Sequence, residues 1–230
     1  MLVSKRSDDG VLELRLNRPQ RLNALTPALT RDLLAAVRQA NQDDTVRVLL
    51  LTGEGRAFCA GKDRDDPATP EFAEALRRLA LALMDGPKPV VAAVQGWAVG
   101  GGLELLLNCD IVVAAQSARF MLPEVNAGLF GTGGVLALLP HKIGLAKAKG
   151  VLMLGQEFSA REAEQWGLIW SVAEDGRLPQ SALAIARQLA AYDPVILGHI
   201  KSSLHFEALG DLSAVLDREA QVHAKLAGPG

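Results

Sequence analysis

KPVVAAVQGWAVGGGLELLL, residues 88–107, is the stretch that determines how this chain folds. Its first part, 89–95, reads as one strand that is apolar on both faces. Glycines at 100–102 then begin an apolar helix at 103–107. Strands of this kind that alternate with amphipathic helices indicate parallel pairing, because helices cover both faces of a parallel sheet. We therefore expect an α/β fold.

The alternation of strand and helix continues on both sides of this segment. Thr26-Pro27 supplies an N-cap and a first-turn proline for a helix that extends to about Asn41. The capping box Ser159-Ala160-Arg161-Glu162 begins another helix, which ends near Gly167. The other predicted elements are strands at 11–16, 46–52, 111–114 and 168–172, and a helix at 72–83.

Beyond Gly176 the pattern changes to helices alone. Three helical stretches, 178–191, 195–208 and 212–226, follow one another without a strand between them. We place a soft domain boundary near residue 176, with an α/β core in 1–176 and a helical C-terminal region in 177–230. The apolar stripes of that region exceed what one core can cover, so we expect the chain to self-associate.

Length and charge exclude several classes of protein. The chain has 230 residues, enough for one large or two small domains. Lys and Arg total 24 against 26 Asp and Glu, so no excess positive charge is available to hold nucleic acid or an anionic membrane. The apolar runs at 48–51 and 90–94 are too short to span a bilayer, and residues 1–10 contain no apolar signal region. We expect a cytoplasmic protein with neither nucleic-acid nor membrane partners.

Several common ligand motifs do not occur in the sequence. Cys59 and Cys109 form neither a C-x-x-C pair nor a zinc spacing with the four histidines, so we interpret both as buried small hydrophobic residues and expect no metal site. No phosphate loop is present, and Gly131-Thr132-Gly133 is followed by Leu136 where a dinucleotide fingerprint requires glycine. A hydrolase triad has no G-x-S-x-G nucleophile.

Two glutamates lie beside glycine-rich segments that follow predicted strands. Glu104 comes directly after glycines 100–102, and Glu124 precedes the glycines of 128–134. In a third segment, 57–63, small residues allow a backbone amide to approach a ligand closely. The start of a helix offers unpaired N–H donors that suit a phosphate or a developing oxyanion. Because a carboxylate is costly to bury unless it is used or paired, these glutamates are candidate functional groups.

These segments together resemble the enoyl-CoA hydratase/isomerase family, also called the crotonase family. The matching motifs keep the order and spacing of the family from about residue 11 to 175. They are Asn17-Arg18-Pro19 with Asn23-Ala24-Leu25, Phe58-Cys59-Ala60-Gly61-Lys62-Asp63, Lys88-Pro89-Val90-Val91-Ala92-Ala93-Val94 with Gly96, Gly100-Gly101-Gly102-Leu103-Glu104, Cys109-Asp110, Arg119-Phe120 with Pro123-Glu124, and 163–168. The resemblance implies a spiral of β-β-α units and a helical C-terminal region that builds homotrimers, often paired into homohexamers.

The resemblance also implies roles for individual residues. It implies an oxyanion hole made by the backbone N–H groups of Lys62 and Gly101, and catalytic carboxylates at Glu104 and Glu124. It implies a coenzyme A thioester as substrate, with no metal or redox cofactor. The implied CoA- and substrate-binding residues are Arg21, Asn23, Ala24, Ala60, Gly61, Lys62, Asp63, Gly100 and Gly101.

Possession of both glutamates favours an enoyl-CoA hydratase, which adds water across the double bond of a 2-enoyl-CoA. Family hydratases use two glutamates, whereas many isomerases keep only the one that matches Glu124. The alternatives are an isomerase or another acyl-CoA reaction that uses Glu124 alone, and a catalytically silent CoA-binding relative. The loop from Asp63 to Phe72, which in the family helps to wall the acyl pocket, is shorter than usual, so the resemblance does not give the length of the acyl chain. Most members continue beyond 227–230 into another helix, so we expect an effect on CoA binding and assembly.

Overall fold

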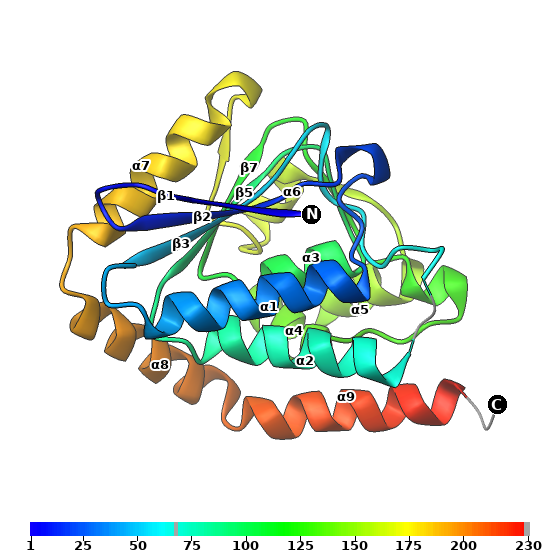
Figure 1. Ribbon diagram of the computed structural model, residues 1–230. Helices are drawn as coiled ribbons and strands as arrows, with labels where there is room; N and C mark the ends of the chain where they lie inside the picture. The colour runs from blue at the N-terminus through cyan, green and yellow to red at the C-terminus, as the bar shows by residue number, and fades with distance from the viewer. Residues whose placement is uncertain (67–68, 228–230) are drawn as a thin grey trace.

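The computed structural model describes residues 1–66 and 69–227, which form two β-sheets surrounded by helices (Figure 1). The larger sheet contains, in spatial order, β1 (Leu2–Arg6), β2 (Val11–Leu16), β3 (Val48–Gly53), β5 (Val90–Val94), β7 (Ile111–Ala115) and β10 (Ser171–Ala173). The smaller sheet contains, in spatial order, β4 (Ala57–Cys59), β6 (Trp97–Val99), β8 (Arg119–Met121) and β9 (Phe158–Ser159).

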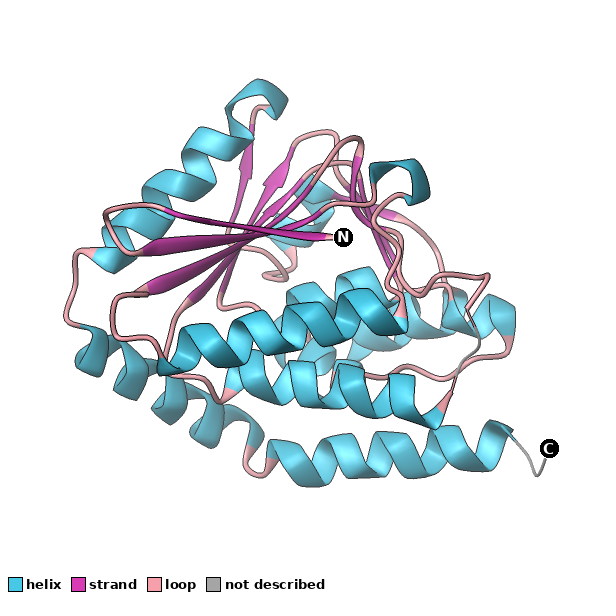
Figure 2. Ribbon diagram, in the orientation of Figure 1, coloured by secondary structure: helices cyan, strands magenta, loops and turns pink. Residues whose placement is uncertain are grey.

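The larger sheet is parallel from β2 to β10, which confirms the predicted pairing. All residues of β5 are buried, because helices cover both faces of the sheet. α7 (Leu178–Ala190) packs on one face, and α1 (Pro27–Gln42) lies on the other (Figure 2). β1 pairs antiparallel with β2 at the edge of the sheet and was not among the predicted strands.

The chain builds both sheets from a repeated unit of two strands and a helix. β3 and β4 are followed by α2 (Pro70–Met84), and β5 and β6 by α3 (Gly101–Leu107). β7 and β8 are followed by the 3-10 helix η2 (Glu124–Ala127) and by α4 (Val135–Ile143). In each unit the first strand joins the larger sheet and the second joins the smaller one. This arrangement confirms the expected spiral of β-β-α units.

Two helices begin as their capping residues predict. At the start of α1, Thr26 Oγ1 accepts a hydrogen bond from the Leu29 N–H at 3.1 Å, and Pro27 occupies the first turn. A proline there costs no hydrogen bond, because the first N–H groups of a helix have no partner within it. α6 (Ala160–Gln165) begins with a complete capping box between Ser159 and Glu162.

The strand expected at 168–172 begins later than predicted. The N–H groups of Leu168 and Ile169 donate to the carbonyl of Ala163 at 2.9 and 3.4 Å, so these residues close the end of α6 and leave only 171–173 for β10. α4 and α5 (Leu145–Leu154) were not predicted at all. α4 exposes Leu136, and α5 exposes Leu145, Met153 and Leu154, so the apolar residues of these helices are not confined to one side.

The three C-terminal helices confirm the prediction for this region. They are α7, α8 (Pro194–Leu209) and α9 (Leu212–Ala227). α7 packs on the larger sheet, so it belongs to the packed core, and the division of the chain near residue 176 stays a prediction. Lys201 anchors α8, since its buried Nζ donates to the carbonyls of Leu83 at 2.6 Å and Lys88 at 3.0 Å. Within the described residues, none of the helices is both long and apolar enough to cross a membrane.

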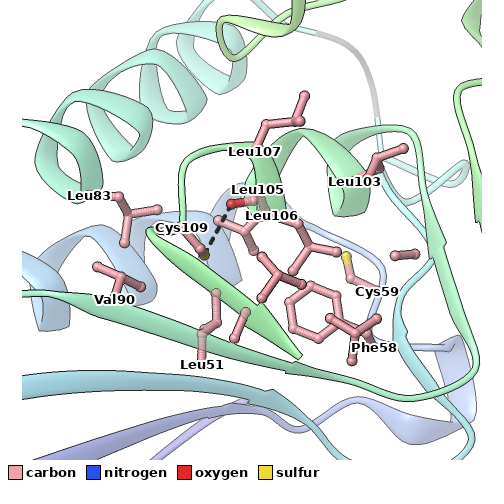
Figure 3. Close-up of a cluster of buried hydrophobic side chains, with 14 of the residues drawn as sticks. Leu51, Phe58, Cys59, Leu83, Val90, Leu103, Leu105, Leu106, Leu107 and Cys109 are labelled. Atoms are coloured by element: carbon pink, nitrogen blue, oxygen red, sulfur yellow. Dashed lines mark hydrogen bonds between the residues drawn. The ribbon is translucent and has the colours of Figure 1, made fainter. Parts of the chain in front are cut away.

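Both cysteines lie in the hydrophobic core, as predicted (Figure 3). The Cys109 thiol donates to the carbonyl of Leu105 at 3.4 Å, and Cys59 lies beside Phe58 in the same core. Burial raises the pKa of each thiol to about 12, so neither ionises near neutral pH. The two side chains therefore act as packing groups.

Candidate active site

The three segments that the sequence singled out lie at the carboxyl ends of neighbouring strands. β4, β6 and β8 are adjacent and parallel in the smaller sheet. Ala60-Gly61-Lys62 follows β4, Gly100-Gly101 follows β6, and Pro123-Glu124 follows β8. The short second sheet therefore brings the three segments together at one edge, where open α/β sheets commonly bind ligands.

A cavity of about 420 Å³ opens at this edge. Its polar lining consists of Glu104, Glu124, Thr69, Thr132 and the basic residues Lys62 and Arg64. Its apolar lining includes Leu25, Phe72, Leu76, Val99, Leu129 and Phe130. An apolar cavity of this size with a few convergent polar groups is typical of a small-molecule site.

The backbone N–H groups of Lys62 and Gly101 lie close together on the cavity wall. A methyl group built on Gly101 would lie 3.7 Å from the Lys62 nitrogen, and one built on Gly61 would lie 3.2 Å from the Gly101 nitrogen. In the part of the chain that the structure describes, neither N–H donates to another backbone group. Two neighbouring donors are therefore available to a single ligand atom.

The glycines at 100 and 102 allow two other segments, β4 and the Glu124 side chain, to lie very close to the start of α3. A Cβ on Gly102 would lie 2.2 Å from the carbonyl oxygen of Cys59, so only glycine lets the start of α3 pack against β4. A Cβ on Gly100 would lie 2.7 Å from Glu124 Oε1. Glycine at 100 therefore leaves the space that the Glu124 carboxylate occupies.

Lys62 turns its side chain away from its own N–H group. Its Nζ donates to the carbonyl of Asp63 at 2.9 Å and to the carbonyl of Asp66. The Asp63 carboxylate is buried and pairs with Arg18 at 3.0 Å and Arg21 at 3.3 Å. Although burial acts to raise it, the hydrogen bonds and charges of these arginines hold the pKa of Asp63 below its ordinary value. These contacts fix the loop that presents the Lys62 amide.

Glu104 is a buried residue of α3, 5% exposed, whose carboxylate is held by Thr132. Thr132 donates its backbone N–H to Oε1 and its hydroxyl to Oε2, each at 2.8 Å. Asn108 Nδ2 donates to the Glu104 carbonyl at 2.8 Å and to the Gly133 carbonyl at 3.1 Å. The loop that contains Thr132 is thus linked to α3 in two places: directly to the side chain of Glu104, and through Asn108 to its backbone carbonyl.

Glu124 begins η2 and lines the same cavity. Its Oε2 atom is buried, and no group among the described residues donates a hydrogen bond to it. A buried acceptor without a partner is unfavourable, which makes this oxygen available to a ligand. Glu124 therefore has one carboxylate oxygen without a hydrogen-bond donor among the described residues, whereas both oxygens of Glu104 are held by Thr132.

Both carboxyl groups hold their protons more strongly than in water. Burial, and then the charge of Glu124, raise the pKa of Glu104 to about 8, while the hydrogen bonds from Thr132 oppose the shift. Burial also raises the pKa of Glu124. Near neutral pH the pair therefore retains a proton and can supply one acid and one base.

The sequence of residues 6–228 matches the profile of the family described as enoyl-CoA hydratase/isomerase. The chain belongs to this family. It is 40% identical to the 1,2-epoxyphenylacetyl-CoA isomerase of Escherichia coli (strain K12), over 96% of this chain and 88% of that protein. The 2,3-dehydroadipyl-CoA hydratase of the same strain is 36% identical, covering 99% of this chain and 90% of that protein.

The fold is that of the crotonase family in solved structures as well. An enoyl-CoA hydratase from Mycobacterium avium subsp. paratuberculosis K-10 superposes with a TM-score of 0.94 at 31% identity, covering 100% of this chain and 94% of that chain. An enoyl-CoA hydratase/isomerase from Pseudoalteromonas atlantica T6c superposes with a TM-score of 0.91 at 34% identity, covering 100% of this chain and 92% of that chain. The relatives of this chain thus include proteins named as hydratases and as isomerases, so membership of the family does not by itself identify the reaction.

The cavity gathers most of the residues that the resemblance to the enoyl-CoA hydratase/isomerase family implied. Those that line it are Ala60, Gly61, Lys62, Gly100, Gly101, Glu104 and Glu124. Arg21, Ala24 and Asp63 are not part of its lining, and their contact with CoA stays a prediction.

Asn23 is not part of the cavity lining, and its contact with substrate stays a prediction. Its side chain is fully buried. Its Nδ2 donates to the carbonyls of Glu54 at 2.9 Å and Ala57 at 2.8 Å, and its Oδ1 accepts from the Arg18 N–H at 2.8 Å. Asn23 therefore joins the loop before α1 to the start of β4.

Sequence reasoning missed Thr132, the residue that holds Glu104. The run Gly131-Thr132-Gly133 was considered only as a dinucleotide motif. Its glycines do indicate close packing, because a Cβ on Gly133 would lie 3.4 Å from the Cβ of Glu104. A hydroxyl residue between two glycines was the available signal for a contact with a buried carboxylate.

Proposed function

We propose that this chain is an enoyl-CoA hydratase, which adds water across the double bond of a 2-enoyl-CoA thioester. One observation carries the proposal: Glu104 and Glu124 line the same cavity as the neighbouring amides of Lys62 and Gly101. Hydration of an enoyl thioester needs both an acid–base pair and a site for negative charge on the thioester oxygen. This cavity offers both within one small volume.

In the proposed mechanism the thioester oxygen accepts hydrogen bonds from the N–H groups of Lys62 and Gly101. Attack of water at Cβ moves an electron pair from the double bond toward this oxygen. Preorganised donors stabilise the charge where it develops, and each can contribute about 3 kcal/mol. Since both donors are backbone atoms, the lysine side chain at position 62 leaves the site intact.

The two glutamates divide the proton transfers. Glu104, oriented by Thr132, takes a proton from the water whose oxygen bonds to Cβ. Glu124, through its free oxygen, gives a proton to Cα. The pair shares one proton, and in the reactive form this proton lies on Glu124, so that Glu104 is the base and Glu124 the acid. After each turnover the proton taken up by Glu104 returns to Glu124. The chemistry uses no metal and no redox cofactor.

Isomerisation of an enoyl-CoA double bond is the second candidate. It is favoured by the contrast between Glu124, whose Oε2 has no partner among the described residues, and Glu104, whose two oxygens are held by Thr132. A single free carboxylate can carry a proton from Cα to Cγ. A catalytically silent CoA-binding protein is the remaining alternative.

The products formed from two substrates test the proposal. A 2-enoyl-CoA and a 3-enoyl-CoA are presented separately to the purified protein, and the products are separated from the substrates by chromatography and identified by retention time and mass. Gain of one water by the 2-enoyl-CoA supports the hydratase. An isobaric product from the 3-enoyl-CoA, with no hydration of the 2-enoyl-CoA, overturns it in favour of the isomerase. CoA binding without any product identifies the silent alternative.

We further propose that the chain assembles as a homotrimer or a homohexamer. Large apolar side chains are exposed on α8: Val195, Ile196, Ile200, Leu204 and Phe206. An exposed apolar face of this extent on one helix is typical of a surface that another copy covers.

A further inference from the structure

Glu219 of α9 is a buried carboxylate that lies outside the three segments of the site. It is 3% exposed and is not part of the cavity lining. It accepts hydrogen bonds from the N–H groups of Gly134 at 2.8 Å and Leu136 at 2.9 Å. These N–H groups belong to the first turn of α4, so a residue from the C-terminal helix caps α4.

α4 needs this cap because its own N-cap residue is Gly134, which has no side chain to offer. Gly133 and Gly134 both have positive φ, +64° and +86°. This backbone brings Gly133 against Glu104, leaving only 3.4 Å between a Cβ at 133 and the Cβ of Glu104. Gly133 thus allows the contact with Glu104, Gly134 leaves α4 without a side-chain cap of its own, and Glu219 supplies that cap.

The loop that Glu219 caps is the loop that holds Glu104. Thr132 donates to both oxygens of Glu104, and Gly134, two positions further, donates to Glu219. The two carboxylates are near enough that the charge of Glu219 contributes to the raised pKa of Glu104. A short run of backbone therefore connects α9 to the site.

α9 is also attached to α2, independently of Glu219. Arg77 of α2 donates to Asp217 at 2.6 Å and to Ser213 at 3.0 Å. Leu216 is buried against the core. Because these contacts hold the helix in place, the bonds of Glu219 fix the loop against a firm support.

We infer that Glu219 is a positioning residue for Glu104, acting through the loop 131–134. The inference rests on the proposed function, in which Glu104 is a catalytic carboxylate. When Glu219 is removed, the N–H groups of Gly134 and Leu136 lose their acceptor and the loop no longer keeps Thr132 in one place. Glu104 then samples other orientations, while the apolar walls that bind the acyl group are unchanged.

The first test compares the kinetics of three variants. Glu219→Ala should lower kcat by about 10- to 100-fold, the usual effect of a small misplacement of a catalytic group. KM should change by less than about threefold, because binding is not affected. The kcat of Glu219→Gln should lie between those of the wild type and Glu219→Ala, since the glutamine amide oxygen still accepts one of the two hydrogen bonds. Asp217→Ala removes only the ion pair between α9 and Arg77 of α2, and Ser213 and Leu216 still hold the helix, so this variant should keep the wild-type kcat.

The second test repeats Glu219→Ala in a Glu104→Gln background. If Glu219 acts through Glu104, the loss of kcat should disappear there, because residues in one chain of contacts are not additive. A loss of equal size in both backgrounds overturns the inference, as does a folded Glu219→Ala protein with wild-type kcat. A merely structural role for Glu219 would lower activity in both backgrounds alike.

Amide hydrogen exchange of residues 131–136 tests the loop contact without any turnover. Exchange there should be faster in Glu219→Ala and unchanged in Asp217→Ala. If the wild-type protein hydrates no enoyl-CoA, the proposed function fails, and the exchange result still decides whether Glu219 holds the loop. Unchanged exchange in Glu219→Ala overturns the inference, whatever the reaction.

Discussion

Thr132 donates hydrogen bonds to both carboxylate oxygens of Glu104, each at 2.8 Å. One bond comes from its backbone and the other from its hydroxyl, so the two can be separated by mutation. Both bonds lower the pKa of Glu104, against the burial that raises it to about 8. Thr132 therefore sets both the orientation and the proton affinity of this glutamate.

Thr132→Val should shift the pH dependence of the reaction. Valine keeps the shape of threonine but removes the hydroxyl bond, so the pKa of Glu104 should rise further. The limb of the kcat/KM profile that reports Glu104 should move to higher pH. Thr132→Ser, which keeps the hydroxyl, should leave the profile in place. A valine variant with the wild-type profile would contradict the assignment of that limb.

Gly101→Pro tests whether the Gly101 amide stabilises the oxyanion. Proline removes the N–H and is tolerated at the first position of a helix. Turnover should fall by at least about a hundredfold, as for loss of one oxyanion donor. Gly101→Ala is the matched control, because its Cβ would lie 3.4 Å from Leu25 Cδ1 and the N–H would remain. Wild-type turnover in a folded Gly101→Pro protein would exclude this donor.

Replacement of each glutamate by glutamine separates the two reactions. If hydration needs both groups, Glu104→Gln and Glu124→Gln should each lower kcat by about 10² to 10⁴. The double variant should lose less than the product of the two effects, because the residues act as a unit. In an isomerase, Glu124→Gln should be inactive while Glu104→Gln keeps most activity. A Glu104→Gln protein that binds CoA and hydrates at the wild-type rate rules out the hydratase mechanism.

The raised pKa of Glu104 predicts how stability changes with pH. Its folded-state pKa of about 8 exceeds the value of 4.5 for an exposed glutamate, so the folded protein binds the extra proton between these limits. The free energy of unfolding should therefore fall as pH rises through this window, by about 1.4 kcal/mol per unit from this group. Glu104→Gln has no such group. Its melting temperature relative to wild type should rise steadily from pH 5 to pH 8, and a constant difference would contradict the burial argument.

Assembly through α8 can be tested by placing a charge on its exposed face. Leu204 is 64% exposed on this helix. Leu204→Glu should shift the mass measured by light scattering from a trimer or hexamer toward a monomer, because a charge resists burial between copies. Leu204→Met keeps the apolar character and should keep the wild-type mass. A wild-type protein that is monomeric at micromolar concentration would contradict the assembly.

The larger sheet was predictable because burial on both faces leaves a readable pattern. β5 is buried at every position, and β3 at four of its six, so both appear as continuous apolar runs. β4, β6 and β8 contain three residues each, too few to show a period, although they bring the site together. A sequence pattern reports burial along an element and not its neighbours in space.

The two contacts that hold Glu104 in place were not predictable for a related reason. The bond between Thr132 and Glu104 joins residues 28 positions apart, and the bond between Gly134 and Glu219 joins residues 85 positions apart. Nothing local to Glu219 distinguishes it from Asp217, the exposed carboxylate of the same helix. Only the folded chain shows that one of them is an α4 cap.

The amides of Lys62 and Gly101 follow β4 and β6, which are adjacent strands of one sheet. Neighbouring strands lie about 4.8 Å apart in every sheet, whatever their side chains. The distance between these two N–H groups is therefore set by the main chain and not by side chains. Under the proposed function, substitutions in α2 or η2 can change which thioester binds, or which acid contacts it, without changing the spacing of these two N–H groups. The side chains that act as acid and base can therefore change while the two backbone donors stay in place. A redesigned active site can keep these donors and replace the acid and the base.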